Sequence, residues 1–154
     1  MQAALIYPEY AYLPGRTPRH PEGWFDAIRD TVRPGLSVPE LAQTSAWRAG
    51  LAYLEQGFFW EAHEVLEPVW MALPQGSAER ELVQALIQLA NACLKREMGR
   101  PRAVLRLCAM VARHLDRVGD APVMGQTPSE LRIAVRALEN QIRRDAPNLQ
   151  NSAI

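Results

Sequence analysis

The residues best suited to chemistry lie within residues 58–70 of this 154-residue sequence. If this segment is helical, at about 100° per residue, two tryptophans and three ionisable residues fall within a sector of about 120°. These are Trp60, His63, Glu64, Glu67 and Trp70. A surface helix normally keeps its aromatic and charged residues on opposite faces. The pattern predicts a polar cluster at the margin of the core, with the two tryptophans as its walls.

Within this cluster, His63 and Glu67 are four residues apart, the spacing at which side chains meet on a helix. A carboxylate that accepts the imidazole proton fixes the tautomer and leaves the other nitrogen free as a base or metal ligand. Pro68 has no N–H to donate to the carbonyl of Glu64. We therefore expect a kink in this helix and a free carbonyl oxygen beside the cluster.

A divalent metal, zinc or similar, is one interpretation of the cluster. A catalytic zinc site takes three protein ligands and keeps one open position. His63 and Glu67 supply two ligands, and Glu64 or His20, from the proline-rich residues 17–21, would complete the set. Glu64 would then be the catalytic base of a metal-assisted hydrolysis. A metal-free site for a small polar ligand and a purely structural His–Glu pair are the alternatives.

The next predicted helix, residues 77–98, carries a narrow stripe of amides on an otherwise apolar surface. Gln84, Gln88 and Asn91 fall within about 60° of one another. A helix this apolar should lie centrally in a bundle. We expect Gln84 and Gln88 to be hydrogen-bond donors to a ligand held in a cleft between this helix and residues 58–72.

From about residue 45 the sequence pattern is helical, and no segment alternates long enough to predict a strand. Helices are expected at residues 45–57, 58–72, 77–98, 101–118 and 127–145, with Gly57, Gly99 and Gly119 as stops and Ser77 as an N-cap. Thr127 and Glu130 have the spacing of a capping box. Residues 1–23 form an irregular arm. The sequence predicts an all-α fold, one helical-bundle domain spanning residues 1–154.

A faint repeat gives the rival functional hypothesis. A helix ending at Gly57 and followed by Ala62 resembles the pair around Gly99 and Ala103, 42 residues later. Helical hairpins with a small residue at the close approach are typical of tetratricopeptide arrays. In this interpretation the protein is a non-enzymatic interaction module, and the His–Glu pair only fixes helix packing.

Composition narrows the function classes. Hydrophobic residues make up 48% of the sequence, an ordinary value for a globular protein. The formal net charge is zero, so the overall charge does not attract nucleic acid or an anionic membrane. No apolar run approaches the roughly 18 residues of a membrane helix, and the first residues do not resemble a signal peptide. Cys93 and Cys108 are expected to be buried thiols, and His114 a boundary residue. The cytoplasm is the expected compartment.

The charges are unevenly distributed along the chain. Residues 55–81 are acidic and residues 95–117 basic. We interpret these as two solvated faces. The alternative is that the two charged segments orient an anionic ligand or a second subunit in a homo-oligomer. The arginines of residues 102–117 have no aromatic residues between them, so they predict a solvated face and no nucleic-acid binding.

The motif His63-x-x-x-Glu67-x-x-Trp70 resembles the signature of a bacterial and archaeal family, the domain-of-unknown-function family 309. Residues 82–90 are similar to the family's next helix, although Ala85 stands where a glycine is expected, and residues 99–102 are similar to the following turn. The resemblance covers roughly residues 45–117. It implies an all-helical fold and a metal-binding role for His63 and Glu67. It implies no activity, because the family has none established.

Overall fold

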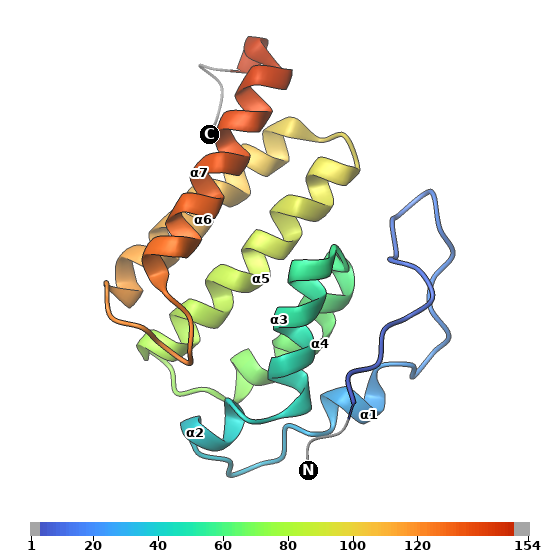
Figure 1. The fold of residues 1–154 in the computed structure, drawn as a ribbon, viewed down its shortest axis with the longest axis vertical. Coiled ribbons are helices and arrows are strands. Elements are labelled where there is room, and N and C mark those ends of the chain that lie inside the picture. The colour runs from blue at the N-terminus through green and yellow to red at the C-terminus, as the bar shows by residue number, and fades with distance from the viewer. Residues whose placement is uncertain (1–3, 150–154) are drawn as a thin grey trace. The chain divides into compact units, whose positions relative to one another are not determined.

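The computed structural model describes residues 4–149, and the regular elements in this part are all helices (Figure 1). Within these residues there is no strand, only an isolated bridge between Val123 and Gln126. The helices form two compact units, Met1–Leu73 and Pro74–Ile154. The predicted all-α fold is confirmed. That the chain forms a single domain stays a prediction.

The first unit consists of the arm and four helices: α1 (Asp26–Arg29), α2 (Val38–Leu41), α3 (Ser45–Gln56) and α4 (Phe59–Ala72). The Thr44 hydroxyl caps α3 by accepting from the backbone N–H of Trp47 at 3.2 Å. Gly57 ends α3 in the left-handed region, with φ of 88°, where glycine has no steric penalty. These ends confirm the predicted helix over residues 45–57.

Helices α3 and α4 pack as a hairpin that depends on the absence of a side chain at Gly50. A Cβ atom at Gly50 would lie 2.3 Å from Cδ2 of Leu66. Real Cβ atoms do not approach this closely, so the two helices meet through a bare backbone on one side. Tyr53, Val65 and Leu66 are fully buried in this unit.

The N-terminal arm lies beside α3 and α4, held by specific contacts (Figure 1). The Tyr53 hydroxyl donates to the carbonyl of Ile6 at 2.6 Å. The ring of Tyr7 packs against the rings of Tyr53 and Phe58, each with a centroid separation of 5.6 Å. Residues 4–23 form no regular helix, as the prolines of the arm predict.

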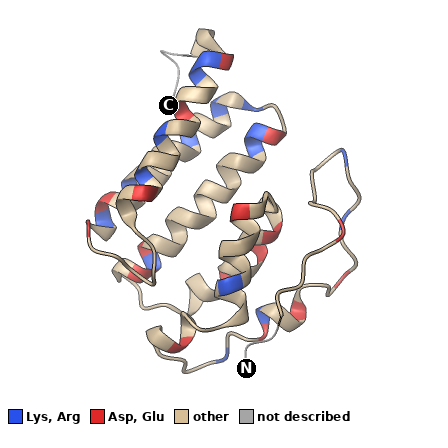
Figure 2. Cartoon of the chain, in the orientation of Figure 1, with Lys and Arg blue, Asp and Glu red and all other residues tan. Residues whose placement is uncertain are grey.

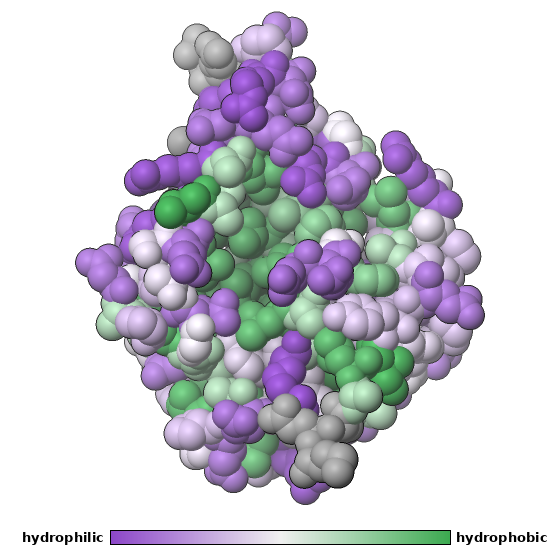
Figure 3. Space-filling view, in the orientation of Figure 1, coloured by the Kyte–Doolittle hydropathy of each residue, from purple (hydrophilic) through white to green (hydrophobic). Residues whose placement is uncertain are grey.

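The second unit consists of α5 (Ala78–Glu97), α6 (Pro101–Val118), α7 (Pro128–Asp145) and a 3₁₀ turn, η1 (Pro147–Leu149). The predicted cap at Ser77 is present, since its hydroxyl accepts from the backbone N–H of Arg80 at 3.1 Å. Pro101 occupies the first turn of α6, as expected. Hydrophilic residues cover the visible C-terminal part of α7 (Figure 3).

Two local predictions differ from the structure. The Thr127 side chain makes no cap hydrogen bond, because the backbone N–H of Glu130 bonds instead to the carbonyl of Thr127 at 3.1 Å. The predicted capping box at α7 is therefore wrong. A capping box does form at Ser37 and Glu40, where the single turn of α2 is too short to show helical periodicity.

No helix within residues 4–149 has the length and apolarity needed to span a bilayer.

A candidate ligand pocket beside His20

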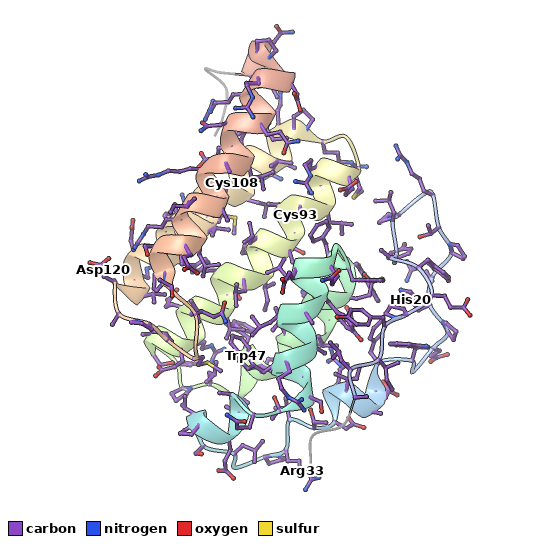
Figure 4. All side chains as sticks on the ribbon, in the orientation of Figure 1. His20, Arg33, Trp47, Cys93, Cys108 and Asp120 are labelled. Carbon is purple, nitrogen blue, oxygen red and sulfur yellow. The ribbon has the colours of Figure 1, made fainter. Side chains whose placement is uncertain are left out.

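A pocket of about 370 Å³ opens in the first unit. The arm, α1 and α4 supply its walls, and Figure 4 shows His20 on the arm beside the α3–α4 pair. Polar and aromatic side chains alternate around it. The lining residues include Tyr12, His20, Trp24, Arg29, Trp60 and Glu64.

The centre of the wall is a buried pair between His20 and Glu61. Nε2 of His20 lies 2.5 Å from Oε2 of Glu61, and the two side chains are 5% and 0% exposed. The same carboxylate oxygen accepts from the backbone N–H of Tyr12 at 2.7 Å. Oε1 of Glu61 is buried without a hydrogen-bond partner within the described residues. A single carboxylate thus anchors the arm at two points.

Aromatic rings hold the imidazole of His20 in place. Tyr10 stacks on it with a centroid separation of 4.9 Å, and Phe25 meets it edge-on at 5.3 Å. Trp60 and Trp24 lie at 6.0 and 6.2 Å. With the ring fixed and Nε2 bonded to a carboxylate, the tautomer with a proton on Nε2 is favoured. Nδ1 is then the acceptor of this imidazole, and His20 lines the pocket.

Glu61 also acts on Tyr53 in the hairpin core. Burial raises the pKa of the Tyr53 phenol to about 12, with further contributions from the charges of Glu61 and Tyr7. Burial and a nearby negative charge both disfavour the phenolate.

The carbonyl that Pro68 leaves free is occupied by an arginine. Pro68 lies inside α4, and Nη1 of Arg29 donates to the carbonyl of Glu64, the residue four positions earlier. Nη1 also lies 3.7 Å from Oε2 of Glu64. The predicted free carbonyl is confirmed, and its bond to Arg29 places a cation and a carboxylate on the pocket wall.

The predicted pair of His63 and Glu67 forms, but it lies outside the lining of the pocket. Nε2 of His63 lies 3.4 Å from Oε2 of Glu67, and the side chains are 34% and 42% exposed. Neither residue lines the pocket, and neither does Trp70. Of the α4 residues proposed from sequence, Trp60 and Glu64 line it. The sheltered histidine is His20.

The amides predicted to join the site lie in the second unit. Gln84 and Gln88 are half-buried on α5, and Oε1 of Gln88 accepts from Nδ2 of Asn91 at 3.2 Å. A cleft shared between these amides and α4 stays a prediction.

The histidines and carboxylates do not assemble a three-ligand metal site in the part of the chain that is described. The three predicted ligands, His20, His63 and Glu67, are instead divided between two pairs: His20 with Glu61, and His63 with Glu67. This donor arrangement does not fit a catalytic zinc site, which takes three protein ligands. A metal at His63 and Glu67 stays a prediction.

Glu61 is the residue that the sequence interpretation missed. The sequence does contain a signal for it: Glu61, Val65 and Val69 are spaced i, i+4 and i+8, which places the carboxylate on the apolar stripe of α4. An acidic residue at such a position is almost never buried without a partner. That rule predicts a partner for Glu61 but does not identify His20.

A comparison with family models matches residues 47–107 to a domain of unknown function (DUF309). Over residues 47–107 the chain is similar to this family. The DUF309 segment runs from α3 into α6, so it contains Glu61 and Glu64 but neither Tyr12 nor His20. The resemblance inferred from the residues is confirmed over this segment. The pocket therefore combines a DUF309 helix with an arm that lies outside the matched segment.

Comparisons with curated proteins and with solved structures gave no match.

Proposed function

We propose that the protein binds a small polar ligand in the pocket of the first unit, with Nδ1 of His20 as hydrogen-bond acceptor. Glu61 is the positioning residue, because it holds Nε2 of the imidazole. The observation that carries the proposal is the buried His20–Glu61 pair at the wall of a 370 Å³ pocket.

The energetic cost of this pair supports a functional role. Removing two ionisable groups from water is expensive, and an apolar pair of similar volume would often stabilise a protein as well or better. Buried, partnered titratable groups beside a cavity are therefore typical of ligand sites. The volume lies within the range of small-molecule pockets, about 300–1,000 Å³.

The wall chemistry indicates the class of ligand. Trp24 and Trp60 offer flat apolar surfaces, whereas Arg29 and Glu64 offer a donor and an acceptor of opposite charge. A compact ligand with one flat or apolar face and both donor and acceptor groups satisfies all of these walls. Amino acids, nucleosides and sugars have this character.

Two other functions proposed from sequence have narrower support. A metal-dependent hydrolase with Glu64 as base rests on the pair of His63 and Glu67, 3.4 Å apart. A tetratricopeptide-like interaction module rests on the hairpin packing of α3 with α4 and of α5 with α6. The pocket-based proposal has the advantage that its histidine is both sheltered and oriented.

A ligand screen with two matched histidine variants tests the proposal. A panel of amino acids, hydroxy acids, nucleosides and sugars is screened by thermal shift and by tryptophan fluorescence, on untagged protein. A compound of this panel should stabilise the wild type and the His63→Gln variant but not His20→Gln. The proposal is wrong if no compound binds, or if His20→Gln binds as well as the wild type while circular dichroism shows both folded.

Metal analysis of the same untagged protein tests the alternative. Stoichiometric zinc that is lost in His63→Gln would favour the metal site over the pocket.

A further inference from the structure

Four arginines form a straight stripe on the outer face of α6. At about 100° per residue their directions differ by no more than about 60°, and at about 1.5 Å per residue the stripe is about 22 Å long. All four side chains are exposed: Arg102, Arg106, Arg113 and Arg117. The opposite face of α6 is buried, including Val104, Cys108, Val111 and Leu115. The stripe is therefore the solvent side of a strongly amphipathic helix.

The stripe has few ion pairs, although an exposed carboxylate, Asp116, lies three residues after Arg113. Only Arg117 has an ion pair in the described part of the chain, with Nη1 at 3.7 Å from Oε1 of Glu81. The other Glu81 oxygen lies 2.7 Å from Nδ1 of His114. Arg102, Arg106 and Arg113 have no ion pair or hydrogen bond within residues 4–149.

The stability of α6 does not explain this arrangement. Like charges four residues apart destabilise a helix, and two such pairs occur here. Arg102 lies in the first turn of α6, where the helix dipole disfavours a cation, and only Arg117, in the last turn, is favoured by it. Like-charge pairs that destabilise α6 are consistent with a binding role for the stripe.

The surroundings favour an anionic partner. Residues 74–149 contain twelve basic and eight acidic residues, a net charge of +4, and Figure 2 shows basic positions along α6 and α7. The same residues contain no Phe, Tyr or Trp. Binding of single-stranded nucleic acid relies on aromatic rings that stack with bases. Carboxylates need no such rings, and the arginine fork pairs with them in two parallel hydrogen bonds.

We propose that this stripe binds an acidic helical segment of a partner protein. The partner helix carries carboxylates separated by four, seven and four residues, so that they form a row of the same length as the arginines. The interaction is independent of the ligand pocket, which lies in the other unit.

Fluorescence anisotropy with two synthetic peptides tests the inference. One fluorescein-labelled alanine-based helix carries four glutamates at the matching spacing, and the second has the same composition with the glutamates distributed around the helix. The full-length protein should bind the matched peptide about tenfold more tightly, and raised salt should weaken the binding.

Charge-reversal variants locate the binding surface. The double variant Arg106→Glu/Arg113→Glu should weaken binding of the matched peptide by about tenfold or more, since it replaces two exposed ion pairs with repulsions. The control Arg16→Glu/Arg33→Glu makes the same change of net charge at exposed positions of the first unit and should have little effect. Circular dichroism verifies that both variants are folded.

Three results would overturn the inference. These are equal binding of the two peptides, equal loss in the two double variants, and tighter binding of a DNA oligonucleotide than of the matched peptide. The first two would mean that only diffuse charge acts, and the third that the stripe binds phosphates.

Discussion

His20 and Glu61 are 41 residues apart in sequence, yet Nε2 of the histidine lies 2.5 Å from Oε2 of the glutamate. This contact joins the irregular arm to α4 and orients an imidazole at the wall of a pocket. The position of the arm and the wall of the pocket therefore depend on one carboxylate.

Replacing Glu61 with glutamine should destabilise the protein and loosen the arm. The substitution keeps the size but removes the charge-assisted bond to His20, worth about 2 kcal/mol. Urea unfolding measures the loss, and limited proteolysis within residues 4–23 measures the loosening. The matched control Glu67→Gln breaks the half-exposed pair with His63 and should cost less than about 1 kcal/mol. Equal losses in the two variants would contradict the account.

The Tyr53 phenol should ionise with a pKa of about 12. Between pH 10 and pH 12 the folded chain keeps this proton while the unfolded chain loses it. The stabilisation is thus complete below about pH 10 and disappears as the pH rises through 12. Ultraviolet titration of tyrosinate, compared with Tyr53→Phe, measures the pKa. In Glu61→Gln the pKa of Tyr53 should fall, and an unchanged pKa would exclude the influence of a Glu61 charge.

Gly50→Ala should destabilise the α3–α4 hairpin by about 1–3 kcal/mol. The added methyl would lie 2.3 Å from Cδ2 of Leu66, so the helices must separate or Leu66 must move. A double-mutant cycle with Leu66→Ala measures the coupling in unfolding free energy. Gly50→Ala should cost much less once Leu66 is shortened, and additive losses would show that the close approach does not limit packing.

Arg29→Met should cost about 1–2 kcal/mol, because it leaves the carbonyl of Glu64 without a partner. Pro68→Ala supplies the missing helical N–H. In the Pro68→Ala background, Arg29→Met should therefore cost less, as measured by thermal or urea unfolding. The same cost in both backgrounds would mean that Arg29 does not compensate for Pro68.

Local signals were sufficient to predict most helices. Thr44, Gly57, Ser77 and Pro101 act through neighbouring backbone groups, so their effect can be inferred from the sequence around them. The helix α2 was not predicted because a single turn shows no periodicity. The capping box at Thr127 was predicted wrongly because the backbone geometry decides which acceptor the N–H of Glu130 bonds to.

The candidate site was predictable only in part. The proline rule predicted a free carbonyl at Glu64, and the i, i+4 rule predicted the His63–Glu67 pair. Neither rule specifies contacts across 41 residues, so His20 was predicted only as a further ligand beside His63 and Glu67, and its contact with Glu61 was missed. The contact arises from the path of the arm, which no local periodicity encodes.

The most direct test of the account is nitrogen NMR of the three histidines, His20, His63 and His114, during titration with a compound that stabilises the protein. Before addition, the His20 ring should show a protonated Nε2 and an unprotonated Nδ1. On binding, the Nδ1 signal of His20 should shift while the signals of His63 and His114 stay constant. A shift of His63 with an unchanged His20 would contradict the assignment of the pocket as the functional site.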